Sequence, residues 1–141
     1  NEVRAFTTDG SECLWHRSFG PDRARSRFVR SVAVSEGNGS GSPAVAVGLA
    51  NGWACCFAGD GSPLWSLKFD SPIVKLCMVR DHTAIAQEDG RISLVDAGGE
   101  VVRSRDLDSP PSSLASTEQR WPGDPLILAG AAEGQLLAFR V

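Results

Sequence analysis

The sequence predicts an all-β fold built from repeated four-stranded antiparallel units. Three observations lead to this prediction: an internal repeat, short apolar stretches of strand length, and turn residues at intervals of about 8–12 positions. The 141 residues are enough for one domain with a hydrophobic core. A content of 42% hydrophobic and 22% charged residues is typical of a folded chain and argues against disorder.

The repeat becomes visible when the sequence is shifted by 38 residues against itself. Five identical residues then coincide, either turn glycines or members of an Asp-Ser-Pro triplet: Gly52 with Gly90, Gly61 with Gly99, and 70–72 with 108–110. With looser spacing the pattern recurs at both ends of the chain, in AFTTDGSECLW at 5–15 and in AAEGQLLAFRV at 131–141.

One repeat unit, 72–108, shows what the repeat contains. Four strand-like stretches follow one another in it: 72–79, 83–86, 91–95 and 101–107. The first is apolar and rich in β-branched residues, and the last is the most polar, as expected of an outer edge strand. Asp89-Gly90 is a strong hairpin signal, and such turns interrupt the sequence too often for helices.

Units of about 40 residues with four antiparallel strands are typical of the blades of a β-propeller. The blades are expected at 1–20 (the end of one blade), 28–70, 72–108 and 112–141 (a last blade without its outer strand). These make about three and a quarter blades, fewer than the roughly four that a closed ring needs. We therefore expect missing upstream blades or another chain to complete the ring. An open β-solenoid is the alternative, although four antiparallel strands per unit argue against it.

The segment GWACCFAGDGSPLW at 52–65 resembles the repeats of PQQ-type, or more broadly WD-like, propellers. In those repeats a strand is followed by an Asp-Gly-type turn and then by a strand that bears tryptophan. The segment at 5–15 resembles them too, whereas the third unit has Arg103 where Trp65 stands. The resemblance implies the fold and not an activity, because this propeller type is similar in catalytic quinoproteins and in structural proteins. The recurrence of Trp15 and Trp65 favours packing between blades over ligand binding.

Two stretches contain candidate partner contacts. PDRARSRFVR at 21–30 is rich in arginine and would suit phosphate or an acidic partner, although a solvated loop between blades that runs into a strand is the simpler explanation. A tryptophan in the insertion at 116–124 would anchor a partner if it lies on a rim, whereas packing against its own blade is the alternative. The Gly/Ser-rich insertion at 35–43 is expected to be a surface loop. The candidate contacts are Arg23, Arg25, Arg27, Arg30 and Trp121.

The sequence predicts no catalytic, cofactor-binding or metal-binding residues. No carboxylate pair, nucleophile–base pair or phosphate-binding glycine loop stands out from the sequence. The cysteines form no CxxC pair and are predicted to be small buried hydrophobic residues in a reducing compartment: Cys13, Cys55, Cys56 and Cys77. Asp60 lacks the alternating acidic pattern of a calcium loop.

The most economical hypothesis is a non-catalytic protein-interaction or scaffold module, formed by the C-terminal blades of a propeller in a larger protein or complex. A net charge of −3 favours protein partners over nucleic acid, and no apolar stretch is long enough for a membrane span. The alternative is a PQQ-like propeller domain of an enzyme, either a quinoprotein dehydrogenase or a propeller appended to an adenylate-forming enzyme. A third possibility is an assembly factor that captures client strands by edge pairing. An intracellular, cytoplasmic location is expected, with the sequon at Asn38 as a weak sign of secretion.

Overall fold

The computed structural model describes residues 2–19, 28–36, 42–117 and 125–141. Within these ranges every regular element is a β-strand, so the all-β prediction is confirmed. The thirteen strands are β1 (Glu2–Phe6), β2 (Cys13–Ser18), β3 (Val29–Ser35), β4 (Ala44–Leu49), β5 (Trp53–Ala58), β6 (Pro63–Lys68), β7 (Ile73–Val79), β8 (His82–Gln87), β9 (Arg91–Val95), β10 (Val101–Asp106), β11 (Pro111–Thr117), β12 (Leu126–Ala131) and β13 (Leu136–Arg140).

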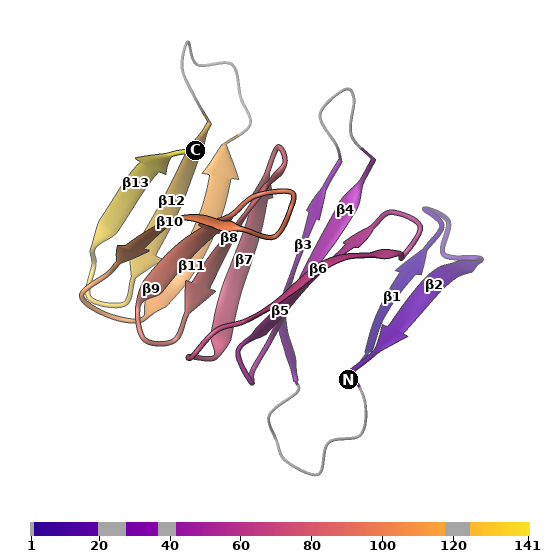
Figure 1. Cartoon of the computed structure of the whole chain (residues 1–141), viewed down its shortest axis with the longest axis horizontal. Coiled ribbons are helices and arrows are strands. Elements are labelled where there is room, and N and C mark those ends of the chain that lie inside the picture. The colour runs from indigo at the N-terminus through magenta and orange to yellow at the C-terminus, as the bar shows by residue number, and fades with distance from the viewer. Residues whose placement is uncertain (1, 20–27, 37–41, 118–124) are drawn as a thin grey trace.

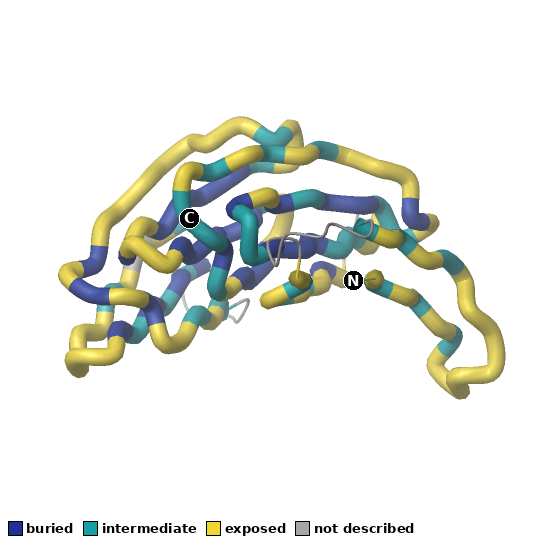
Figure 2. Tube along the Cα trace, turned by 90° about the horizontal axis from the view of Figure 1, so that it is seen from below, coloured by how far each residue is buried: buried dark blue, intermediate teal, exposed yellow. Residues whose placement is uncertain are grey.

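The strands form four antiparallel sheets, in which strands that follow one another in the sequence are hydrogen-bonded neighbours. In chain order the sheets are β1-β2, β3-β4-β5-β6, β7-β8-β9-β10 and β11-β12-β13, which we call blades 1 to 4. Figure 1 shows the blades side by side, and Figure 2 shows from below that they follow an arch. The architecture is that of a partial β-propeller, and the described strands do not close the ring.

Burial falls from the first three strands of a blade to its fourth. In blade 3, β8 and β9 are buried except at their first residues, whereas every residue of β10 is exposed. The sequences agree with this difference, since β8 reads HTAIAQ and β10 reads VVRSRD, with two arginines and an aspartate. Inner strands are covered by the neighbouring blades on both faces, and the fourth strand lies at the rim.

The first strands of neighbouring blades are joined through side chains. Three serine hydroxyls bridge β7 to β3 and β11: Ser31 Oγ accepts from the Leu76 N–H (2.9 Å), Ser35 Oγ donates to the Arg80 carbonyl (3.1 Å) and Ser116 Oγ donates to the Met78 carbonyl (2.9 Å). The last two bonds bring the ends of β3, β7 and β11 together on one face of the arch. We call this the upper face, because it lies at the top of Figure 1, and the opposite one the lower face.

The hydrophobic core lies between the blades. Blades 2 and 3 share one cluster of buried residues: Ala46, Ala54, Cys56, Ile73, Leu76, Met78, Ile85 and Val95. Blades 3 and 4 share two: Cys77, Val79, Ala84, Leu94 and Ile127, and then Ala86, Ile92, Leu107, Ala129 and Ala131. Each fully buried large aliphatic side chain stabilises the fold by roughly 1.5–3 kcal/mol, so the stacking of blades is the main source of stability.

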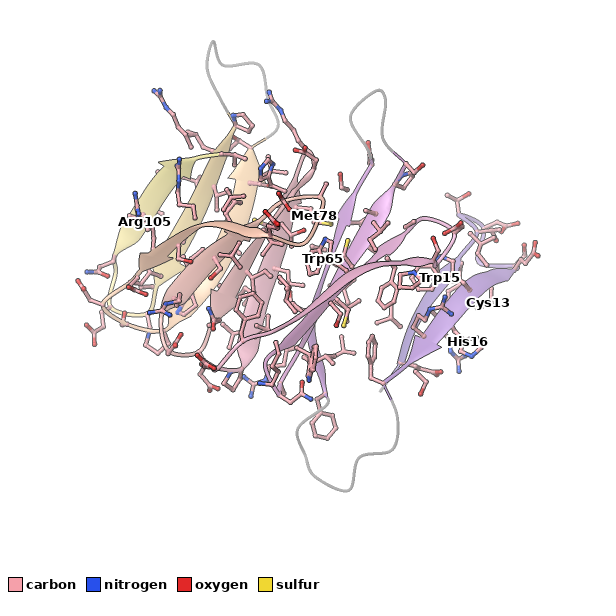
Figure 3. All side chains as sticks on the ribbon, viewed as in Figure 1. Cys13, Trp15, His16, Trp65, Met78 and Arg105 are labelled. Carbon is pink, nitrogen blue, oxygen red and sulfur yellow. The ribbon has the colours of Figure 1, made fainter. Side chains whose placement is uncertain are left out.

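Two tryptophans on outer strands join blade 1 to blade 2 and blade 2 to blade 3. Trp15 on β2 donates from Nε1 to the Gly59 carbonyl at 2.8 Å, and its ring lies against Gly61 in the same turn. Trp65 on β6 lies in the same way against Gly99 of blade 3. Figure 3 labels both side chains. The prediction that these tryptophans pack between blades is therefore confirmed.

Candidate interaction surface

Val32 and Val34 form an apolar surface on the first strand of blade 2. A register shift after the first paired residue of both β3 and β7 shows that Val32 holds the place of Leu76, and Val34 that of Met78. Val32 and Val34 are 46% and 63% exposed, whereas Leu76 and Met78 are 7% and 8% exposed. Side chains from all four strands of blade 2 pack with Leu76 and Met78 in one cluster. Blade 1, which lies on the side of Val32 and Val34, is described only by two strands.

Phe6, the last residue of β1, exposes its aromatic ring at the same end of the arch. Phe6 holds the place of Phe57, since both follow a register shift next to a residue paired with tryptophan. Phe57 is 7% exposed, because Trp15 and Phe19 of blade 1 pack on it at ring-centroid distances of 6.2 and 6.4 Å. The Arg17 guanidinium also lies 5.8 Å from the centre of that ring. Phe6, in contrast, is 51% exposed.

Blade 4 exposes an equivalent surface at the other end of the arch. Leu136 on β13 holds the place of Ala54 and Ile92, since each forms the last pair of its ladder with the second strand of its blade. Ala54 and Ile92 are each 1% exposed, whereas Leu136 is 74% exposed. Both ends of the arch therefore present apolar side chains at positions that the interior blades bury.

The outer edge of β13 adjoins a hollow between blades 3 and 4. β13 pairs only with β12 among the described strands, whereas β5 and β9 each pair on both sides. The hollow has a volume of about 290 Å³ and is lined by Asp106, Leu107, Asp108, Gln135, Leu136 and Leu137. Gln135 binds Asp108 twice, accepting from its backbone N–H at 3.2 Å and donating to its carboxylate. This edge is where a fourth strand of blade 4 would run.

The upper face contains a strained turn at its centre. Arg80, between β7 and β8, has a φ of 54°, and it is the one non-glycine residue in the described part of the chain with a positive φ. Beside it, His82 Nδ1 lies 2.8 Å from the exposed Asp81 carboxylate. The corresponding connections in blades 2 and 4, 36–43 and 118–125, are longer. Strained backbone of this kind costs about 1–3 kcal/mol and is often found at functional sites.

Of the predicted partner contacts, the structure places Arg30. It lies at the start of β3 on the lower face, where Nη1 is 3.7 Å from Glu88 Oε2 of blade 3. This exposed ion pair contributes at most about 1 kcal/mol. The remaining predicted contacts lie outside the described residues: Arg23, Arg25, Arg27 and Trp121. The end of β11 and the start of β12, between which Trp121 lies in the sequence, are on the upper face. Arg30 is on the lower face and is therefore not close to these two strand ends.

The cysteines agree with the prediction at the inner strands but not at the rim. Cys56 and Cys77 are buried, and burial raises the pKa of each thiol to about 11. Burial also raises the pKa of the partly buried Cys55. Cys13 is exposed, which corrects the prediction, because it begins an outer strand next to a turn. The described residues contain no group of three or more His, Cys, Asp or Glu that suits a metal ion.

The outer strands expose an aliphatic row that the sequence analysis missed. Leu14, Leu64 and Val102 each precede the Trp or Arg position of their strand, and each is just over half exposed. The description of the fourth strands as the most polar hides this row, because it rests on the polar residues in the later half of each strand. Their recurrence at one position per repeat was the available signal.

Comparisons with known proteins agree with the architecture. No family model matches the chain, and no curated protein matches its sequence. BBS1N, solved in complex with ARL6DN, is similar with a TM-score of 0.80 and 11% identity over 99% of this chain and 44% of that chain. BamB from Moraxella catarrhalis has a TM-score of 0.71 and 16% identity, covering 99% and 39%. Sqt1 from Saccharomyces cerevisiae has a TM-score of 0.74 and 14% identity, covering 94% and 37%.

The chain therefore spans less than half the length of these solved chains. Because the identities are below 20%, the likeness concerns the fold, and the fold is that of a β-propeller. Among the described residues there is no helix of the length and apolar character that crossing a membrane requires.

Proposed function

We propose that the chain is a non-catalytic protein-interaction module, formed by blades of a β-propeller within a larger protein or complex. The observation that places the chain within a larger propeller is the exposure, at both ends of the arch, of apolar positions that are buried between the interior blades. In stacked repeat proteins a terminal repeat needs a polar outer face to remain soluble. Val34 and Leu136 give these terminal faces the opposite character, which suits protein contacts.

The upper face is the surface we assign to a separate partner. The ends of β3, β7 and β11 meet there through the hydroxyls of Ser35 and Ser116. Arg80 and the exposed Asp81 stand beside the ends of β3 and β11. Loops on a rigid scaffold are the usual carriers of binding residues. The similarity to BBS1N, which was solved with a protein bound, supports this class of function.

The test is the purification of the complete natural polypeptide, tagged and expressed at its natural level, followed by native mass spectrometry. We expect a second protein in a fixed ratio, and we expect Asp81→Arg to remove it. Glu133→Arg, an exposed charge reversal in a turn of blade 4 on the lower face, is the matched control and should retain it.

Two results would overturn this proposal. One is a complex whose composition is the same for both variants, or no associated protein at all. The other is a quinone absorbance with bound calcium in the purified polypeptide, which would favour the enzyme alternative.

A further inference from the structure

The turn between β1 and β2 has the same backbone geometry as the corresponding turns of blades 2 and 3. In each turn a glycine with a φ between 71° and 86° donates to the carbonyl three residues earlier: Gly10 to Thr7 at 2.8 Å, Gly61 to Ala58 at 2.8 Å, and Gly99 to Asp96 at 3.1 Å. All three blades therefore present the same backbone surface to whatever lies before them in the arch.

In blades 2 and 3 this surface is covered by a tryptophan of the preceding blade. A Cβ at Gly61 would lie 2.7 Å from Cγ of Trp15, and a Cβ at Gly99 would lie 2.7 Å from Cβ of Trp65. Because both distances are too short for any side chain, these two turns require glycine for space as well as for φ. Around Gly10 no described atom lies within 4 Å of the Cβ position, so its turn is open.

A second, independent observation indicates what covers this turn. The Trp15 side chain that lies on Gly61 also packs on Phe57, which Phe19 of the same blade helps to bury. Phe6 stands beside Gly10 as Phe57 stands beside Gly61, and its ring is half exposed. An indole placed on Gly10 would cover the ring of Phe6 as well.

We propose that Gly10 and Phe6 form the docking site for the outer strand of one more blade, and that this strand carries a tryptophan. The inference rests on the proposal that the chain belongs to a larger propeller, and it specifies the chemistry of one contact in it. The indole N–H would donate to the carbonyl of Thr8, which holds the place of Gly59 in blade 2.

The occupant belongs to the same polypeptide, on the N-terminal side of Glu2. In blades 2 and 3 the second strand ends three residues before the third begins, with 50–52 and 88–90 as the connections. By analogy, β1 is the third strand of blade 1, and the second strand of that blade ends about three residues before Glu2. This second strand helps to cover Val32 and Val34. The solved propellers named above agree with this source, since their single chains are more than twice as long as the part matched here.

The experiment places asparagine at these turns in the complete natural polypeptide. Asparagine tolerates a positive φ, so its effect reports the space above the turn and not backbone strain. We expect Gly10→Asn to lower the midpoint of urea unfolding about as much as Gly61→Asn does. Glu12→Asn, which introduces the same residue at an exposed position just after the same turn, is the control and should leave the midpoint unchanged.

Hydrogen–deuterium exchange of 2–19 supplies a second readout if Gly10→Asn does not fold well, with Gly10→Ala as the milder variant. Faster exchange in this segment than in wild type is expected for a displaced tryptophan. The proposal is overturned if Gly10→Asn behaves like Glu12→Asn while Gly61→Asn destabilises, or if the natural polypeptide has no blade before Glu2. Retention of an Asp81-dependent partner in either case would leave the proposed function standing.

Discussion

The hydroxyl of Ser31 on β3 accepts a hydrogen bond from the backbone N–H of Leu76 on β7, at 2.9 Å, although the two strands belong to different blades. β7 is the end strand of its sheet and pairs only with β8, so the hydroxyl of Ser31 takes the place of a backbone acceptor on the other edge of β7. Leu76 is buried in the core between blades 2 and 3, so its N–H has little access to water.

We expect Ser31→Ala to lower the free energy of unfolding by about 1–3 kcal/mol, because it leaves a buried N–H without an acceptor. Urea unfolding of the purified protein measures the loss. Ser112→Ala is the matched control, since its hydroxyl donates to the Gly130 carbonyl in an exposed position of its own blade. A loss equal to that of the control would show that the Ser31 bond does not join the blades.

Trp65→Ala is expected to destabilise the protein far more than Arg103→Ala. Trp65 packs against the core between blades 2 and 3, and its loss should cost about 2–4 kcal/mol. Arg103 holds the same place in blade 3, but it is exposed and donates only from Nη1 to the Arg140 carbonyl at 2.9 Å, so its loss should cost less than about 1 kcal/mol. Thermal unfolding of both variants distinguishes the two side chains, and equal shifts would contradict the assignment of Trp65 to the core.

The exposed thiol and the two buried thiols should react at different stages at pH about 8. Cys13 is exposed and should be alkylated first by iodoacetamide. Cys56 and Cys77 are buried, and their pKa values of about 11 leave almost no thiolate at this pH. They should therefore react only when the protein unfolds. Intact and peptide mass spectrometry over time follows the labelling, and simultaneous modification of all four thiols would mean that the blades are not packed as described.

Asp9 should remain ionised to an unusually low pH. Hydrogen bonds from Thr7 and Ser11 hold the pKa of its carboxyl at about 2, below the ordinary value of 3.8. Since the folded-state pKa is the lower one, the stabilisation is present above about pH 4 and is lost as the pH falls towards 2. Carboxyl-carbon NMR titration measures this value, and Ser11→Ala should raise it. An unchanged pKa in Ser11→Ala would show that the turn does not control the ionisation.

Much of the fold was predictable because the repeat contains turn residues at fixed places. Gly61 and Gly99 have positive φ values in equivalent turns, and Trp15 and Trp65 pack on them, so a sequence alignment of the units finds both partners of each contact. The alternation in β-strands then indicates which side chains face inward.

The candidate surfaces were less accessible from the sequence. The strained turn at Arg80 has no glycine or proline to mark it, and its φ depends on the short connection between β7 and β8. The exposure of Val32 depends on which strands lie beside it, which no property of valine reveals. The ion pair of Arg30 with Glu88 joins two blades, and Arg30 within 21–30 reads in sequence as part of a basic loop.

The central claim, that further strands of the same propeller cover the two ends of the arch, is tested most directly by hydrogen–deuterium exchange of the complete natural polypeptide. We expect the backbone amides of β1 and β13 to be protected as strongly as those of β5 and β9, which have a strand on each side. Fast exchange in β1 and β13, with protection retained in β5 and β9, would mean that both ends are free edges and would contradict the account.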